Sequence, residues 1–183
     1  MSILPIRIHP APVLRRKSRK VRKIDASIQK LIDDMIETMR DAPGVGLAAP
    51  QIGRPIRVIV IEVPDHDLIA LINPEFVRRE GQRQVEEGCL SVPGYKAEIS
   101  RSVTVTVKGL DREGRPLRIK ATAREDDPMG ALLAQALEHE IDHLNGVLYI
   151  DYLDSPDQLV RLEPDEVLSE GEPVRASAAG GSR

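Results

Sequence analysis

The chain has 183 residues, of which 41% are hydrophobic and 30% are charged, a composition typical of a globular protein with one main domain. Only 2% of the residues are aromatic and none is tryptophan, so we expect an aliphatic core and no aromatic platform for stacking single-stranded nucleic acid. The net charge of -3 is small but unevenly spread, because residues 15–23 carry seven basic side chains. Such a run indicates either a solvated surface or a contact with an anionic partner.

Cys89 is the only cysteine, which excludes a disulfide within the chain and fits a reducing compartment. The first residues show no apolar segment followed by a cleavage site, and no stretch has the roughly 20 apolar residues that cross a bilayer. We therefore expect a cytoplasmic protein with neither DNA nor a membrane among its partners.

The clearest element is a helix over residues 25–40, where apolar side chains recur at steps of three and four residues. Asp25 is suited to cap its first turn, and the helix stops before Pro43. The next elements are a glycine-rich loop and two strands, at residues 44–53, 57–63 and 68–74.

Alternating polarity predicts a strand over residues 102–110, and the turn sequence after it predicts a hairpin with residues 115–121. A second helix is expected over residues 130–144, ended by Asn145-Gly146. Because the strands follow one another instead of alternating with helices, this order indicates an α+β fold. We place one domain at residues 1–153.

Residues 154–183 are expected to form a tail that is first acidic and then rich in Gly, Ser and Ala, a composition typical of disorder.

The most informative motif is HEIDH, with His139, Glu140 and His143 inside the second predicted helix. Positions i and i+4 of a helix lie on one face, so both imidazoles can reach one metal ion. Glu140 lies about 100° around the helix from His139, where it can carry a proton without being a ligand. Zinc hydrolases use this spacing, and its place in an amphipathic helix favours a metal site over two surface histidines.

A catalytic metal site needs a third protein ligand and one open position. Tyr149 stands where metalloproteases with the extended motif H-E-x-x-H-x-x-G-x-x-H have their third histidine. A distal carboxylate, Glu163 or Glu166, is one candidate. Cys89, in EGCLS, is the other, because a thiolate is a strong, soft ligand. Beside such a helix, in a chain with one cysteine, we favour Cys89 as a ligand over Cys89 as a small buried residue.

The loop GVGLAAPQIG, residues 44–53, is not a phosphate-binding loop, since no Lys-Ser/Thr pair follows it. Gly44 and Gly46 allow the backbone to approach a ligand closely. Gln51 offers an amide donor of the kind that stabilises an oxyanion. Alone, the segment fits an ordinary helix-to-strand connection equally well.

The segments GVGLAAPQ, EGCLS and HEIDH resemble, in this order, the three motifs of the peptide deformylases, and the resemblance covers about residues 2–153. It implies an α+β fold in which antiparallel sheets pack around a central helix carrying HEIDH. It also implies a hydrolase that removes the N-formyl group from the N-terminal formylmethionine of newly made proteins and releases formate.

The same resemblance implies metal ligation by Cys89, His139 and His143, and a general acid/base role for Glu140. Fe(II) is implied as the native ion, with Zn(II), Ni(II) or Co(II) as other ions that the site takes. Two further groups are then expected to hold the developing oxyanion, namely Gln51 and the backbone N–H of Leu90.

The resemblance also implies where the N-formyl-Met peptide lies. Its backbone is expected to run as an added strand between Gly44–Gly46 and Glu87–Gly88. Its methionine side chain is expected in an apolar pocket lined by Val45, Leu132 and Ala136.

Three features depart from the family pattern. Glu138 stands where glutamine is commoner, and residues 124–130 look like an insertion before the metal helix. The acidic tail differs from the basic C-terminal helix with which some bacterial members dock on the ribosome, so the basic segment 15–23 is the expected ribosome contact. Two other functions compete: a zinc endopeptidase using His139, His143 and a distal carboxylate such as Glu163, and a non-enzymatic domain with a structural metal that binds RNA.

Overall fold

The structure is a computed structural model that describes residues 2–162. Two α-helices and eight strands lie in this part of the chain: α1 (Ala26–Asp41), β1 (Gly46–Ala48), β2 (Val58–Ile61), β3 (Ile69–Glu80), β4 (Arg83–Gly88), β5 (Tyr95–Arg101), β6 (Thr104–Leu110), β7 (Pro116–Thr122), α2 (Pro128–Asn145) and β8 (Val160–Arg161). Short 3-10 helices connect them: η1 (Pro12–Arg15), η2 (Ala49–Ile52), η3 (Tyr149–Tyr152) and η4 (Pro156–Gln158).

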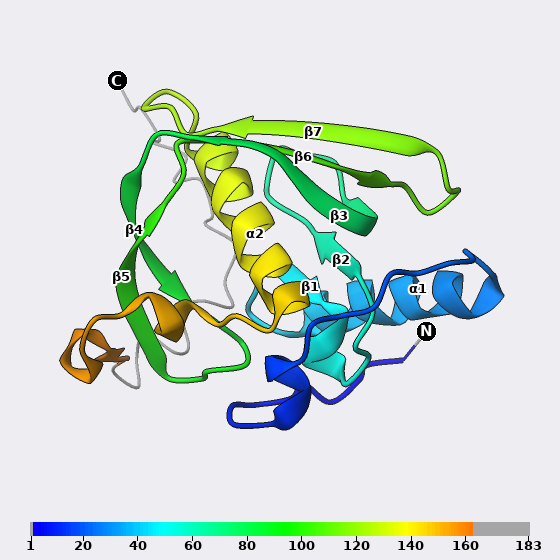
Figure 1. Cartoon of the computed structure of the whole chain (residues 1–183), viewed down its shortest axis with the longest axis horizontal. Helices are drawn as coiled ribbons and strands as arrows, with labels where there is room; N and C mark the ends of the chain where they lie inside the picture. Colours follow the sequence, from blue (N-terminus) through cyan, green and yellow to red (C-terminus); the bar gives the residue numbers. More distant parts are fainter. Residues whose placement is uncertain (1, 163–183) are drawn as a thin grey trace, which may run out of the picture.

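The strands form two antiparallel sheets. One has five strands in the order β1-β2-β3-β6-β7, and the other has three in the order β4-β5-β8. Helix α2 runs between the two sheets, with α1 lying away from the three-stranded sheet (Figure 1). The α+β fold with antiparallel sheets is therefore confirmed, and the helix between the sheets carries HEIDH.

The two faces of the five-stranded sheet are covered differently. On one face of this sheet, helix α2 packs against aliphatic side chains of β2, β3 and β6, which include Ile59, Leu71 and Val107. We call this the α2 face. The opposite face packs against α1 through Val58 and Val60. Both clusters are almost free of aromatic side chains, as the composition predicts, so most burial energy comes from aliphatic contacts.

Helix α1 lies within one residue of its predicted bounds. The carboxylate of Asp25 accepts hydrogen bonds from the backbone N–H groups of Ser27 and Ile28 at 3.0 and 3.3 Å, so the predicted N-cap is confirmed. Neither helix is both long and apolar enough to span a membrane in the part of the chain described here.

Helix α2 begins earlier than predicted. Residues 128–130, which look like part of an insertion in the sequence, form its first turn. Pro128 suits this position because a first-turn residue needs no N–H partner, and Asp127 caps the helix by accepting from Gly130 N–H at 2.7 Å.

The four strands of the predicted list are confirmed, but β1, β4, β5 and β8 were missed. Strand β8 pairs with β5 through Tyr95–Arg161 and Lys96–Val160. The described fold thus continues past the domain boundary placed at residue 153, and the remainder of the predicted tail, residues 163–183, lies outside the described residues.

Helix α2 ends at Gly146, which has a φ of +78° and would place a Cβ 2.7 Å from the carbonyl oxygen of Arg15. We predict that Gly146→Ala lowers the free energy of unfolding by about 2–4 kcal/mol, since it adds a backbone clash to left-handed strain. Urea unfolding at fixed metal loading measures the loss.

Gly94→Ala is the matched control, because Gly94 has the same φ and no atom lies within 4 Å of its added Cβ. It should lose only about 1–2 kcal/mol from the left-handed backbone. Equal losses in the two variants would show that the contact with Arg15 does not constrain this turn.

Candidate metal centre

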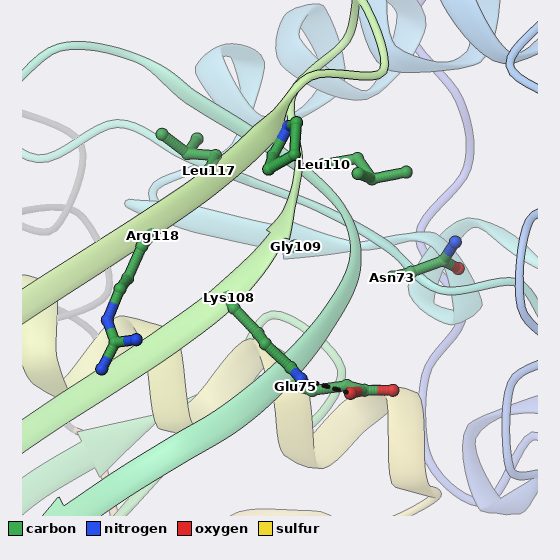
Figure 2. A pocket seen from close by; sticks show the side chains of 8 residues that line it. Asn73, Glu75, Lys108, Gly109, Leu110, Leu117 and Arg118 are labelled. Carbon is green, nitrogen blue, oxygen red and sulfur yellow. Dashed lines mark ion pairs between the residues drawn. The ribbon is translucent and has the colours of Figure 1, made fainter.

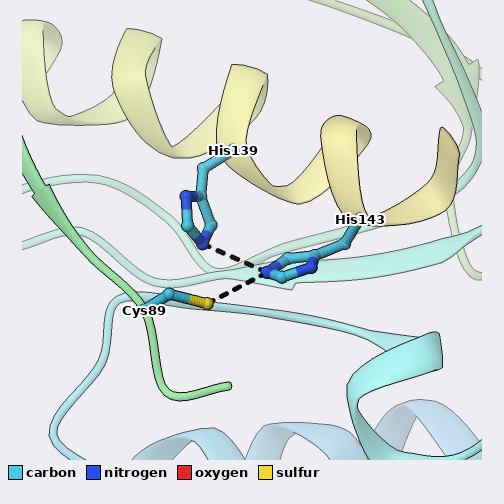
Figure 3. A group of neighbouring side chains, drawn as sticks. All are labelled: Cys89, His139 and His143. Carbon is cyan, nitrogen blue, oxygen red and sulfur yellow. Dashed lines mark hydrogen bonds between the residues drawn. The ribbon is translucent and has the colours of Figure 1, made fainter. Parts of the chain in front are cut away.

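Cys89, His139 and His143 converge at one point (Figure 3). The Nε2 atom of His143 lies 3.3 Å from Cys89 Sγ and 3.1 Å from His139 Nε2. One ligand atom from each residue lies within 4.8 Å of the others. The sequence favoured Cys89 over a distal carboxylate as third ligand, and the structure brings Cys89 to the histidines.

The three side chains come from two parts of the fold. Both histidines project from one face of α2, four residues apart, with their rings edge to face at 84°. Cys89 directly follows β4 of the other sheet. The centre therefore lies where the three-stranded sheet meets the helix.

The arrangement fits a tetrahedral metal ion. Metal–sulfur and metal–nitrogen bonds of about 2.0–2.3 Å separate ligand atoms by roughly 3.3–3.8 Å, close to the two distances from His143 Nε2 to Cys89 Sγ and His139 Nε2. Burial lowers the pKa of His139, but the Cys89 sulfur and the Glu87 carboxylate outweigh it and raise that pKa well above its usual value. The surroundings thus favour positive charge at the point where a cation would bind.

His143 is suited to act as a neutral ligand. Burial, and then the neighbouring His139, lower its pKa well below the usual value, and a neutral imidazole is the form that binds metals. Its Nδ1 atom is buried and makes no hydrogen bond to the described part of the chain.

Glu87 orients the other histidine. Its carboxylate accepts from His139 Nδ1, which leaves Nε2 free to face the ion. Arg101 of β5 holds the same carboxylate with two hydrogen bonds, of 2.9 and 2.7 Å, and reaches Asp142 of α2 at 2.6 Å. Tyr152 completes the group by donating to Asp142 at 2.9 Å.

Glu140 lies in a different environment from Glu87. Burial raises the pKa of Glu140 to about 7, although the nearby His139 opposes that shift. Its Oε2 atom has no hydrogen-bond partner among the described residues, and Gly46 packs against its side chain. A carboxyl group with a pKa near neutrality can both accept and release a proton.

Gln51 and Leu90 flank the cysteine. The Gln51 amide is 1% exposed, donates to Ser91 Oγ at 3.2 Å and lies 3.8 Å from Cys89 Sγ. Its oxygen accepts from the Ala48 N–H at 2.8 Å, so the NH2 group is aimed at the centre. No described residue accepts a hydrogen bond from the backbone N–H of Leu90.

The predicted substrate residues lie in an apolar cluster and at two sheet edges. Val45, just before β1, and Leu132 and Ala136 of α2 belong to one apolar cluster between α2 and the five-stranded sheet. Gly46 begins β1, an edge strand of the large sheet, and Gly88 ends β4, an edge strand of the small one. The other predicted substrate residues, Gly44 and Glu87, lie beside them in the chain.

The model of the polypeptide deformylase family matches residues 3–159 of this sequence. The chain belongs to the polypeptide deformylase family. A peptide deformylase of Dehalococcoides mccartyi is 56% identical over 162 residues, 88% of this chain and 92% of that protein. One of Rhizobium meliloti is 50% identical over 158 residues, 84% of this chain and 86% of that protein.

Solved deformylase structures share the fold. The crystal structure of a peptide deformylase from Legionella pneumophila is 45% identical with a TM-score of 0.78, covering 86% of this chain and 89% of that one. The Ehrlichia chaffeensis enzyme in complex with actinonin is 40% identical with a TM-score of 0.80, covering 86% of this chain and 92% of that one.

Two residues that stood out in the sequence make their hydrogen bonds to groups other than the metal ligands of this deformylase. Glu138 is buried and accepts from the N–H and hydroxyl of Ser102 at 2.8 and 3.0 Å, so its carboxylate binds the connection between β5 and β6. Tyr149, which stands in the position of a third histidine, instead donates to the carbonyl of Tyr95 at 3.0 Å.

Arg101 is the functional residue that sequence reasoning missed. It ends β5, in which alternate side chains are buried, so the period of two could have placed it inside.

The basic segment at residues 15–23 contacts two separate parts of the fold: Arg15 pairs with Asp151 at 2.5 Å, whereas Lys20 pairs with Glu75 at 2.6 Å.

We predict that Cys89→Ala weakens metal binding more than about a hundredfold, which exceeds the usual cost of losing an outer partner of a ligand. Titration of the metal-free protein with Zn(II), followed by elemental analysis after gel filtration, measures the change. Ser91→Ala is the control, because the Ser91 hydroxyl contacts Gln51 and not a metal ligand. Unchanged affinity in Cys89→Ala would remove Cys89 from the ligand set.

Proposed function

We propose that this chain hydrolyses the N-formyl group of N-terminal formylmethionine in newly made proteins, as a metal-dependent peptide deformylase. The observation that carries the proposal is the meeting of Cys89, His139 and His143 beside Glu140 in a member of this family. Formate and a peptide with a free amine are the products.

The donor set of one thiolate and two imidazoles suits Fe(II), Zn(II), Ni(II) or Co(II), with Cys89, His139 and His143 as the ligands. We propose Fe(II) as the native ion. When bound, the ion supplies Lewis acidity, which lowers the pKa of a water molecule at its open position.

Glu140 moves the protons of the reaction. It accepts a proton from the attacking water as the oxygen bonds to the formyl carbon, and it gives a proton to the departing amine nitrogen as the carbon–nitrogen bond breaks. Its raised pKa, about 7, suits both halves of this exchange at neutral pH. Glu87 stays ionised throughout and keeps His139 oriented.

Two donors of the chain hold the formyl oxygen while it becomes negative. The Gln51 NH2 group is fixed by the contact between its own oxygen and Ala48 N–H, so little reorganisation is needed. The N–H of Leu90 is the second donor. Both lie next to Cys89, which places the oxyanion beside the ligand set.

The substrate backbone pairs with the two sheet edges that meet at the centre. Gly44–Gly46 lies on one side and Glu87–Gly88 on the other, so an extended peptide adds a strand between them. Val45, Leu132 and Ala136 then receive the methionine side chain. A formyl carbon carries only hydrogen, so this narrow site admits it and excludes larger acyl groups.

The cellular setting follows from this reaction. We propose a cytoplasmic location, where newly made chains are found. Contact with the ribosome through residues 15–23 stays a prediction. A zinc endopeptidase is not favoured, because the chain belongs to the polypeptide deformylase family and Cys89 joins the two histidines in the described structure.

We predict that the Fe(II) protein, handled without oxygen, releases free amine from N-formyl-Met-Ala-Ser, and that Glu140→Ala lowers this rate at least a thousandfold while metal content stays at wild type. The loss follows from removing the group that carries both protons. Amine release is measured by fluorescamine, with N-acetyl-Met-Ala-Ser as the control substrate.

Amine release from the acetyl peptide at a comparable rate would contradict exclusion of larger acyl groups. No release from the formyl peptide by protein with one ion per chain would contradict the deformylase function itself.

Gly46 should be required because a Cβ there would meet the Glu140 carboxylate, with the Glu140 Cγ only 3.0 Å away. We predict that Gly46→Ala lowers the deformylation rate about a hundredfold by displacing Glu140, since small misplacements of a catalytic group have effects of this size. The bound metal should be unchanged, as measured by elemental analysis.

Gly44→Ala is the comparison, because its Cβ would press only on the flexible end of Leu90, at 3.0 Å. It should lose less activity than Gly46→Ala. The reverse order would indicate that Gly46 acts through the substrate strand and not through Glu140.

A further inference from the structure

The five-stranded sheet leaves part of one face uncovered by either helix. Its α2 face is buried, and α1 covers the other face over β1 and β2. Beyond α1, that second face carries basic side chains in cross-strand register. Lys108 of β6 lies opposite Arg118 of β7, and the next pair along the same face places Lys120 beside Thr106.

The basic segment of the sequence continues this face. Lys20 and Lys108 contact the same carboxylate, Glu75, at 2.6 and 3.7 Å. The Val21 backbone N–H donates to Asn73 Oδ1 at 2.8 Å, and the Val21 carbonyl accepts from Asn73 Nδ2 at 2.9 Å. The end of the segment therefore lies along β3, with Arg22 exposed next to Lys20. We call the exposed cations of Lys20, Arg22, Lys108, Arg118 and Lys120 the basic face.

A hollow of about 340 Å³ opens within the basic face. Leu110 and its cross-strand partner Pro116 line one part of it, and Lys108, paired with Glu75, and Arg118 line another, whereas the Leu117 side chain turns away from them toward the α2 face (Figure 2). The hollow thus combines an apolar floor with cationic groups at its rim. It is built on the face of the sheet opposite α2, so it is distinct from the metal centre.

We propose that the basic face binds RNA, with phosphates on the cations and one unpaired base in the hollow. Basic side chains spaced along strands and a segment suit a polyanionic backbone. An apolar hollow has no role for a phosphate, but it accepts the face of an unstacked base, with the Arg118 guanidinium available to stack on it in place of an aromatic ring. A paired duplex would leave the hollow empty.

The face also argues against a lipid surface. Binding in the interface of a bilayer uses large apolar side chains that project among the cations. Val77 is the one large exposed apolar side chain on β3, β6 or β7 of the described chain, and Leu110 of the hollow is only partly exposed.

The test measures binding of the metal-loaded, full-length protein to a fluorescent RNA hairpin with an unpaired loop, across a series of salt concentrations. Lys108→Gln/Arg118→Gln removes two cations from the strands, and Lys20→Gln/Arg22→Gln removes two from the segment. Each should weaken binding about tenfold and lower the slope of log affinity against log salt by about 1.

Lys30→Gln/Arg161→Gln is the matched control, since it also removes one lysine and one arginine but from α1 and β8. It should bind the hairpin like wild type. Equal weakening by the control would reduce the effect to net charge and overturn the proposal. Equal binding of the hairpin and a fully paired duplex of the same length would overturn the role of the hollow.

Two further readouts separate this proposal from others. Capture by anionic phosphatidylglycerol vesicles without binding to the hairpin would overturn it in favour of a membrane surface. Deformylation of N-formyl-Met-Ala-Ser should be unchanged in all three double variants. RNA binding without deformylation would support RNA binding by the basic face and refute the proposed function. Deformylation without RNA binding would support the proposed function and overturn RNA binding by the basic face.

Discussion

The carboxylate of Glu87 is the interaction on which the metal centre depends. It is buried between His139 of α2 and Arg101 of β5, and it belongs to β4, so one charged group joins the small sheet to the metal helix. Burial alone would raise the pKa of Glu87, but its hydrogen bonds with His139 and Arg101 lower it to about 2. Removing one partner of such a buried pair typically costs about 3–5 kcal/mol of stability. The network therefore keeps His139 in its orientation, because any change that breaks it destabilises the fold.

The two buried glutamates near the metal ligands show how position divides their roles. Glu87 faces a histidine and an arginine and stays ionised. Glu140 has a carboxylate oxygen without a described partner, and burial raises its pKa to about 7. Pairs of carboxyl groups whose surroundings separate their pKa values are a recurrent source of acid/base assignments in enzymes. The fold thus supplies one fixed charge and one transferable proton.

Sequence patterns predicted the parts of this structure that apolar periodicity controls. Both helices and the β6–β7 hairpin bury aliphatic side chains at regular steps, and the i, i+4 spacing of His139 and His143 is a property of the helix itself. Strands β4 and β5 were not predicted, because the side chains that they bury include Glu87 and Arg101, and a hydrophobic pattern assigns charged residues to the surface. The preference for Cys89 over a distal carboxylate rested on its being the one cysteine beside a His/Glu/His helix and then on the family resemblance, since spacing along the chain does not encode which loop reaches the helix.

The basic segment at residues 15–23 shows a second property that the sequence alone could not predict, the distribution of charge on the surface. As a sequence it is one run of charge, but the fold divides it, because Arg15 pairs with Asp151 near η3 whereas Lys20 meets Glu75 on β3. Its latter part gains Lys108 and Arg118 as neighbours, which lie far along the chain and are brought there only by strand register. The density of positive charge on this surface therefore depends on the strand register of the sheet, and not only on the basic run at residues 15–23. A polyanion that binds this chain meets a surface assembled from three strands and a segment, with the hollow between the cations of β6 and β7.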